Sequence, residues 1–396
     1  MRSAYRPGVV MLFLLATLAA TPAARAEEQT EPPPWLEGHA AYRLLALAMD
    51  DMVLDQAGTQ QGQNFWMEQR LRVGATLRRG GLTAKFGADL LTGLLAGDTT
   101  NLGARLVQQP RDRHNAHRGF MLRDAMIAWR SAYGELRLGQ QVSHWGLGLL
   151  SNSGAEPPPF GQQRLGDVME RVAFFTRPLP WLTTGLGADL VFRDSNAELL
   201  EGDIGVNAFA ALIVHLSRHT AGVYGVYRTQ WDHDDERLEV GVVDLYAHGQ
   251  GDLPRGLSWD AALEGMLEAG RTSRMRAEPD LEGADVLAGG AVVRGALAHK
   301  PSRLRFTVEL GFASGDNDLN DDTVRQLHFH SDYRVGLILF REQLGALSAR
   351  SADRLEDAGH QGQAPHGVRH AVSNGGVTNA LYIWPHLAFG PLAGIT

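Results

Sequence analysis

The sequence predicts an all-β protein, an antiparallel transmembrane β-barrel with about fourteen visible strands, and three observations predict it. First, apolar and charged residues alternate with a period of two in segment after segment. Second, the segments are about nine or more residues long, the length that crosses a bilayer at a tilt. Third, short and long connections alternate along the chain, as at the two ends of such a barrel. A soluble β-sandwich would explain the alternation, but not the uniform strand length or the ordered connections.

The start of the chain is typical of an exported protein. Arg2 and Arg6 precede an apolar run over 9–20, and a small-residue cleavage motif follows at 24–26, so residues 1–26 predict a secretory signal peptide. Residues 27–34 are polar and proline-rich and predict a short lead on the periplasmic side. Residues 35–396 then form the barrel, because no later segment offers about eighteen continuous apolar residues for a membrane helix.

The segment 64–92 shows the alternation most clearly and reads as a hairpin around the turn at Gly80 and Gly81. Its first strand carries charge on one face and apolar side chains on the other, and the second strand repeats this pattern. The same alternation of charged and apolar residues in later segments predicts the remaining strands. In chain order the expected strands are 35–48, 65–78, 82–91, 120–131, 135–149, 167–177, 182–193, 206–216, 223–231, 238–247, 257–269, 286–297, 304–312 and 380–389.

The connections between these segments predict the orientation. Those after the odd-numbered strands are mostly long and those after the even-numbered strands are short, which places the long loops outside the cell if the N-terminus is periplasmic. The turn at 178–181 contains two prolines, which strand interiors exclude. Gly390 and Pro391 signal a further turn into another strand. We therefore expect a complete barrel of about sixteen to eighteen strands in a chain longer than this one.

The segment 314–376 lacks the period of two and is far longer than an ordinary loop. Its centre, 333–347, is too apolar to leave in water, and its spacing fits both a helix and a strand. We expect this loop to fold inward over the lumen as a plug. An extracellular cap or a partner-binding loop is the alternative.

Composition excludes some classes of function. The formal net charge is −8, and cleavage of the signal peptide removes three arginines and no acids, so the charge does not favour a nucleic-acid partner. The chain has no cysteine and therefore no disulfide. No nucleophile elbow, P-loop or dinucleotide motif is present, and the glycines around Leu147 read as ordinary barrel glycines. We expect no enzymatic activity and no cofactor, with an outer-membrane enzyme or a non-conducting structural barrel as the alternative.

Two kinds of pattern could suggest a metal site. The acidic run 316–322 has clustered carboxylates, but it does not match an EF-hand loop. When positions are counted from Asp316, the glycine required at the sixth position is replaced by Asp321, and the glutamate required at the twelfth is replaced by Leu327. Three histidine pairs have compatible spacings without a clear third ligand: His114/His117, His328/His330 and His366/His370. We therefore predict no metal site and interpret the acidic run as a solvated loop.

The charged faces of the strands are the candidate functional site. A cation on the lipid face costs about 2–4 kcal/mol at mid-membrane, so these faces point into the lumen. About fourteen strands enclose more space than their side chains fill, which predicts a channel for hydrophilic solutes, with basic residues in the first third of the chain opposed to acids on the strand 257–269. The candidate lumen residues are Glu68, Arg70, Arg72, Lys85, Asp89, Arg130, Glu135, Arg137, Asp189, Arg193, Arg228, Asp260, Glu264, Glu268, Arg305 and Glu309.

Two short segments carry a resemblance to a known family. At 312–316, FASGD, a long strand ends in an acidic loop, and at 134–140, GELRLGQ, a short turn opens a strand; there the chain resembles alginate-export-type outer-membrane barrels. The resemblance implies a large barrel in the outer membrane, gated by loops, that passes secreted polysaccharide with a periplasmic export partner. It also implies a lumen role for Arg70, Arg72, Arg137 and Arg305. The mixed charge of this lumen departs from the arginine-lined conduit of that family and puts an anionic polysaccharide in doubt.

Overall fold

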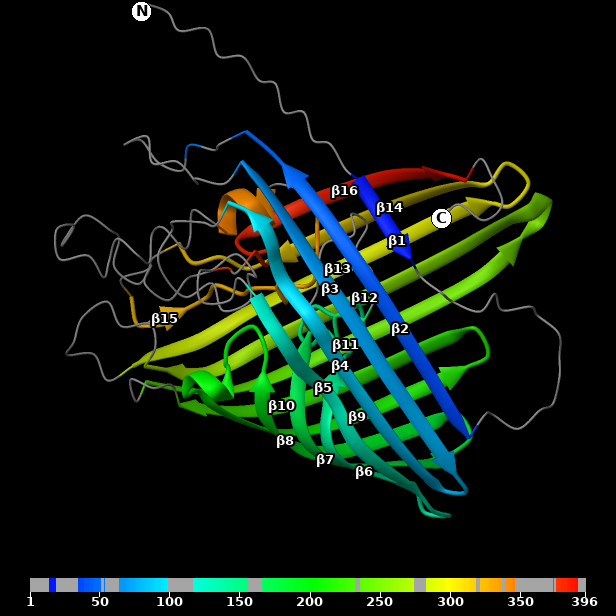
Figure 1. The fold of residues 1–396 in the computed structure, drawn as a ribbon, viewed down its shortest axis with the longest axis vertical. Helices are drawn as coiled ribbons and strands as arrows, with labels where there is room; N and C mark the ends of the chain where they lie inside the picture. The colour runs from blue at the N-terminus through cyan, green and yellow to red at the C-terminus, as the bar shows by residue number, and fades with distance from the viewer. Residues whose placement is uncertain are drawn as a thin grey trace, which may run out of the picture.

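The computed structural model is one antiparallel sheet that curves round an interior (Figure 1). It describes residues 14–18, 35–50, 53, 64–98, 117–155, 166–231, 236–273, 283–317, 321–336, 339–345, 373 and 375–390. The strands of the main path are β1 (Leu14–Leu18), β2 (Leu36–Ala48), β3 (Phe65–Arg79), β4 (Leu82–Gly97), β5 (His117–Arg130), β6 (Glu135–Ser143), β7 (Asp167–Leu179), β8 (Leu182–Arg193), β9 (Ile204–Leu216), β10 (His219–Trp231), β11 (Arg237–Leu253), β12 (Leu257–Thr272), β13 (Ala284–His299), β14 (Leu304–Ala313) and β16 (Ala380–Phe389).

Each strand of this path pairs antiparallel with the next, so the predicted fold class is confirmed. The two-residue strand β15 (Thr323–Val324) pairs in parallel with β13. The short helices are η1 (Leu199–Glu201), η2 (Pro254–Gly256) and η3 (Leu339–Leu344). None of the helices in the described ranges has both the length and the apolar character to span a membrane.

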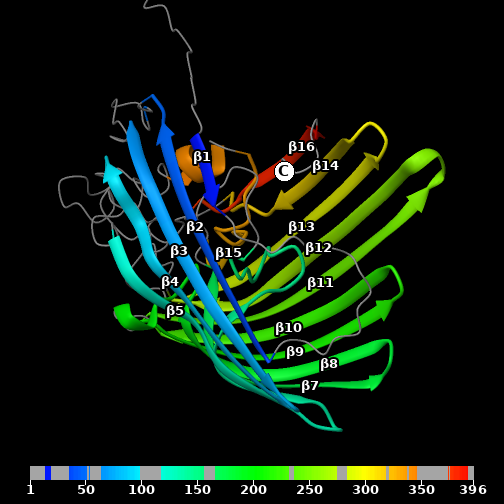
Figure 2. The ribbon, with the colours of Figure 1, turned by 45° about the vertical axis from the view of Figure 1, so that its right-hand side comes forward.

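The sheet turns through most of a circle, so that β2–β5 and β11–β13 face one another across the interior in both views (Figures 1 and 2). The two edge strands, β1 and β16, do not pair with each other in the described part of the chain, so the sheet is not closed there. β1 lies within the predicted signal peptide and covers the outer edge of β2. That residues 1–26 are cleaved stays a prediction, and cleavage would free this edge. The periplasmic lead, 27–34, lies outside the described residues.

The outward face is apolar and the inward face is mixed, as the alternation predicts. In β9, Ile204, Val206 and Leu212 are exposed while Asn207 and Phe209, between them, are buried. The same holds around the sheet, where exposed apolar side chains include Leu186, Leu267, Leu287 and Leu381. So large an exposed apolar surface requires a non-aqueous partner.

Several predicted strand boundaries need correction: β4 continues to Gly97, β5 begins at His117, β10 begins at His219 and β12 continues to Thr272. The segment predicted as a strand over 135–149 leaves the sheet after Ser143. β7 continues to Leu179, with a register shift between Thr176 and Leu179 that accommodates Pro178 at the strand end. β11 continues to Leu253 although Gly249 and Gly251 suggested a turn. The indole of Trp259 lies over those two glycines, so their missing side chains make room for a ring rather than end the strand.

Aromatic side chains occur both outside and inside the sheet. Trp35, Trp129, Tyr133 and Trp181 are exposed close to the short turns, which is the level at which aromatic rings meet lipid headgroups. Trp384 instead packs against a buried cluster inside the sheet.

Candidate channel interior

Arginines gather on the inner face of β2, β3 and β5, and we call Arg43, Arg70, Arg72 and Arg123 the arginine wall. Arg72 makes a bidentate pair with Asp89, with Nε to Oδ1 at 2.6 Å and Nη2 to Oδ2 at 2.9 Å. Arg123 lies 3.6 Å from the same carboxylate, Arg70 is within electrostatic reach of it, and Arg43 lies within electrostatic reach of Arg70 and Arg72. Asp89 is fully buried, so a single acid is surrounded by this wall.

Sequence reasoning predicted Arg70, Arg72 and Asp89 on this face but missed Arg123. The pairing of β4 with β5 shifts register at Gly87 and Ala88, which are opposite Asp124 and Leu122. Arg123 is the extra residue of this bulge, and both it and Asp124 are buried. A bulge breaks the period of two, so the alternation could not place Arg123.

We predict that Asp89→Asn will destabilise the protein by about 3–5 kcal/mol, because it leaves several buried arginines without their carboxylate. Urea unfolding of the purified protein measures this. Glu37→Asn is the control, since Glu37 pairs with Arg78 at an exposed site and its loss should change little. Equal midpoints for the two variants would contradict the prediction.

The other predicted lumen residues mostly occur in pairs on the inner face. Several of their partners were not predicted from the sequence: Arg171, Asp124, Asp194, His248 and Tyr382. The contacts are Lys85 with Asp124 (2.9 Å), Glu135 with Arg130 (2.8 Å) and Arg137 (2.7 Å), Asp189 with Arg171 (2.6 Å), Arg228 with Asp194, Asp260 with His248 (2.9 Å) and Arg305 (3.7 Å), Glu309 with Tyr382 Oη (2.8 Å), Glu68 with Trp66 Nε1 (3.2 Å), and Arg193 with Met121 Sδ (3.2 Å).

Acids gather on the opposite side, where Asp244 of β11 and Glu264 of β12 are both fully buried. The two carboxyl groups lie within electrostatic reach of each other. Asp244 also accepts a hydrogen bond from Nε1 of Trp145 at 3.0 Å. We call Asp244, Glu264 and Glu268 the acidic wall. Sequence reasoning named Glu264 and Glu268 but missed Asp244.

The segment after β6 crosses the interior from one wall to the other, and we call residues 144–155 the inner loop. At one end, Glu264 accepts hydrogen bonds from the backbone N–H groups of Leu147, Gly148 (3.1 Å) and Leu149 (3.0 Å). At the other end, backbone carbonyls accept from the arginine wall: Gly154 from Arg72 at 3.0 Å, and Ser153 from Arg123. The N–H groups thus face the acids and the carbonyls face the arginines.

Two glycines allow this path. Gly146 and Gly148 have φ of 57° and 88°, a region that other residues rarely adopt. A Cβ on Gly146 would lie 2.5 Å from Oε2 of Glu264. The interpretation of these residues as ordinary barrel glycines is therefore wrong, since they shape a loop that approaches a carboxylate closely.

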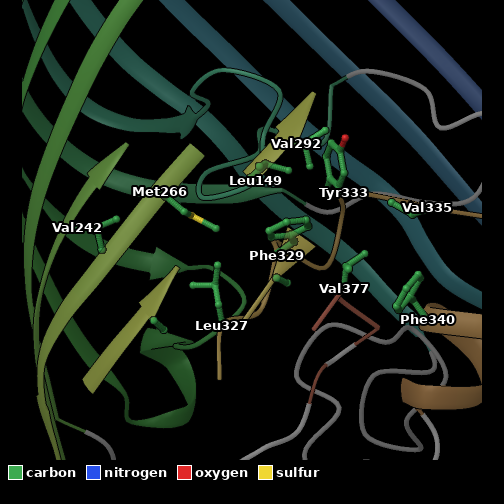
Figure 3. Packing of buried hydrophobic residues seen from close by; sticks show 12 residues of the cluster. Leu149, Val242, Met266, Val292, Leu327, Phe329, Tyr333, Val335, Phe340 and Val377 are labelled. Atoms are coloured by element: carbon green, nitrogen blue, oxygen red, sulfur yellow. The ribbon is translucent and has the colours of Figure 1, made fainter. Parts of the chain in front are cut away.

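The connection between β14 and β16, residues 314–379, is called the long loop, and its described parts pack inside the sheet. Leu327, Phe329, Tyr333, Val335, Phe340 and Val377 form one buried cluster with Leu149 of the inner loop and with Val242, Met266, Ala288, Val292 and Ala313 of the strands. Figure 3 shows Met266 pointing toward Phe329 and Leu149. The central segment that fitted both helix and strand contains one turn of π-helix, η3.

The two loops meet at a buried ion pair between His330 and the first residue of β7. His330 Nε2 lies 2.7 Å from Oδ1 of Asp167, and its backbone N–H donates to the carbonyl of Leu149 at 2.6 Å. Asp332 continues the junction by accepting from the backbone N–H of Gly166 at 2.8 Å. Burial by itself lowers the pKa of His330, but the charges of Asp167, Asp332 and Asp194 and the hydrogen bond to Asp167 outweigh it and raise this pKa to about 9.

We predict that the long loop loosens at alkaline pH. A raised pKa means that the imidazolium stabilises the junction fully below the ordinary value of about 6.5 and that this stability is lost as the pH rises through about 9. Hydrogen exchange of peptides covering 327–335 should therefore rise between these pH values after correction for the intrinsic rate. His330→Gln should remove this change, whereas a pH-independent exchange in the unmodified protein would contradict it.

The described residues give no support to a metal site. They contain no group of three or more His, Asp or Glu side chains placed to hold an ion. In the acidic run, Asp321 and Asp316 face Arg325, with Asp321 Oδ2 at 2.7 Å and Asp316 Oδ1 at 3.8 Å from its Nη1. Burial lowers the pKa of His328 to about 4, and its Nε2 lies 3.1 Å from Gln326. His114, His366 and His370 lie outside the described residues.

Comparison with known proteins gives matches only among solved structures. No family model matches the chain, and no curated protein matches it. The chain is similar to OccAB1 of Acinetobacter baumannii, with a TM-score of 0.47, 13% identity, and coverage of 75% of this chain and 71% of the other. It is also similar to an anion-selective porin of Comamonas acidovorans, with a TM-score of 0.38, 9% identity, and coverage of 69% of this chain and 78% of the other. A third similar structure is OpdK of Pseudomonas aeruginosa with vanillate, with a TM-score of 0.36, 15% identity, and coverage of 64% of this chain and 62% of the other.

Proposed function

We propose that this protein is an outer-membrane channel for small hydrophilic solutes, with two inward loops that narrow the passage. The apolar outer face supports a position in lipid, because a strand can cross hydrocarbon only when its outward side chains are apolar and its backbone is paired in a sheet. All the connections at one end of the sheet are short turns and those at the other end are longer. This asymmetry supports an orientation with the long loops outside the cell.

The observation that carries the proposal is the separation of charge across the interior. The arginine wall on β2, β3 and β5 faces the acidic wall on β11 and β12, and the inner loop spans them with its backbone dipoles aligned to both. A field across a narrow passage orients polar solutes and disfavours apolar ones. Charged side chains inside a sheet with an apolar exterior have no role in lipid and are typical of a wet passage.

The two loops favour small solutes over a secreted polysaccharide. The apolar cluster between the long loop, the inner loop and β11–β14 occupies interior space that a polymer would need. The inner loop is also fastened at both ends, by Glu264 and by Arg72 and Arg123.

Liposome swelling tests this proposal. Vesicles containing the refolded protein should swell in an iso-osmotic pentose and should not swell in a trisaccharide, while vesicles without protein swell in neither. Heat-modifiable migration on a gel, in which the unboiled protein runs faster, establishes that the sample is folded. A folded sample that admits no pentose, or one that admits both sugars at equal rates, would contradict a narrow channel.

A further inference from the structure

A cavity of about 120 Å³ lies between the two inward loops and the inner face of β7–β12, and we call it the chamber. Ser151 and Leu150 of the inner loop and Leu327 and His328 of the long loop form one side of it. Its strand side combines an apolar part, with Met169, Val226, Val240, Val242 and Met266, and a polar part that includes Asn207 and Glu268. At about 10–15 Å³ for each water-sized group, it has room for roughly ten such groups.

The charges that line the chamber leave one carboxylate in excess. Asp194 pairs with Arg228 and also accepts the backbone N–H groups of Asn196 (2.7 Å) and Ala197 (2.8 Å). Asp167 pairs with His330, and Asp189 pairs with Arg171.

Glu268 is the remaining acid. Its carboxylate makes no hydrogen bond within the described part of the chain, and the cation that acts on it is Arg228. The guanidinium of Arg228 is already held by Asp194 and by Oε1 of Gln230, at 2.9 Å from Nε and 2.6 Å from Nη2. Glu268 therefore shares Arg228 with Asp194 and Gln230.

Two further buried oxygens face the chamber without a partner among the described residues. Oδ1 of Asn207 and Oγ of Ser151 make no hydrogen bond there, and their residues are 6% and 8% exposed. A buried acceptor that loses water without gaining a donor costs free energy. A group that carries several N–H donors and a positive charge would satisfy Asn207 Oδ1, Ser151 Oγ and Glu268 together. A carboxylate could accept only from the Ser151 hydroxyl, would give Asn207 Oδ1 no donor, and would lie beside the carboxyl group of Glu268.

We propose that the chamber binds a small organic cation, a primary ammonium on a short apolar chain. The ammonium would donate to Glu268, Asn207 and Ser151, and the carbon chain would lie against Met266 and its apolar neighbours. The inference rests on the proposed function only for the route by which the solute arrives. Binding itself can be measured on folded protein in detergent.

Isothermal titration with n-butylammonium tests the proposal, with n-butanol and butyrate as probes of the same length. Saturable binding of the ammonium alone is expected, and Glu268→Gln should weaken it by roughly tenfold or more, the scale of one charged hydrogen bond. Glu239→Gln is the matched control, because Glu239 lies exposed on the outward face of β11 and its change should leave affinity unaltered. Asn207→Asp, which adds a carboxylate of the same size, should tighten binding severalfold.

Several results would overturn the proposal. They are equal binding of butanol or butyrate, no binding of n-butylammonium to the heat-modifiable protein, or an unchanged affinity in Glu268→Gln. If Glu268→Gln does not fold, Asn207→Asp decides, and an affinity no tighter than that of the unmodified protein then counts against the site. Pentose uptake by liposomes separates the two proposals, since a protein that admits pentose but binds no ammonium keeps the channel and loses the chamber site.

Discussion

Removing residues 329–377 is expected to raise the single-channel conductance severalfold. The deletion takes Phe329, Tyr333, Val335, Phe340 and Val377 out of the interior at once, and with them most of the apolar packing that the long loop makes against the strands. The ends to be joined already lie side by side, because His328 and Thr378 form a β-bridge. A short glycine linker should therefore leave the sheet unchanged.

Planar-bilayer recordings measure the effect of this deletion. Leu339→Ala, on the exposed side of η3, is the control within the same loop and should conduct like the unmodified protein. Heat-modifiable migration and a far-UV spectrum dominated by β-structure show whether the deletion variant has folded. A folded deletion variant with the conductance of the unmodified protein would mean that the long loop does not obstruct the passage.

Glu264→Ala is expected to release the inner loop and to give a larger, noisier conductance. The carboxyl group accepts three backbone hydrogen bonds from Leu147, Gly148 and Leu149, and a typical hydrogen bond contributes about 0.5–1.5 kcal/mol. The substitution removes both oxygens that accept these three hydrogen bonds. The N–H groups would then turn toward water, while the contacts of the loop with Arg72, Arg123, Asp167 and His330 would remain.

Asp260→Ala provides the matched control for this experiment. Asp260 is another inward carboxylate of β12, but it contacts His248 and Arg305 instead of the inner loop. Its loss should change conductance little and should leave the current noise as it was. Equal effects of the two substitutions would indicate a general loss of negative charge, and would count against a specific fastening of the loop by Glu264.

The alternation of side chains was sufficient to predict the sheet because every strand has one face in an apolar environment. Strand period is a local property, and the exposure of side chains alternates over 204–212 in β9 and over 306–313 in β14. The fourteen expected strands correspond to β2–β14 and β16 in the same antiparallel order. The alternation could not predict the residue at which a strand leaves the sheet.

The inner loop illustrates that limit. Residues 144–149 are apolar and glycine-rich, so they resemble a continuation of β6, yet Glu264, whose carboxylate holds them inside, lies more than a hundred residues away in the chain. Arg123 was missed for a different reason, because a bulge between β4 and β5 adds one residue to the count. Neither the distant partner nor the bulge leaves a signal in the local sequence.

The long loop was recognised as unusual from its length and its apolar centre, and its packing inside the sheet depends on contacts that no local pattern reveals. His330 meets Asp167 across the interior, and Phe329 meets Leu149 and Met266. His328 and His330 have a spacing compatible with shared metal ligation, and in the structure they have different partners, since one contacts Gln326 and the other Asp167. The predicted charge separation was coarser than the observed one, in which Arg43, Arg123 and Asp244 complete the two walls.

Single-channel recording of the unmodified mature protein tests the central claim most directly. Refolded protein that migrates as a heat-modifiable band should insert into a planar bilayer and give discrete, reproducible current steps that are absent from a boiled sample. A current that stays at baseline for the folded protein and for the variant lacking 329–377 would contradict the assignment of a channel.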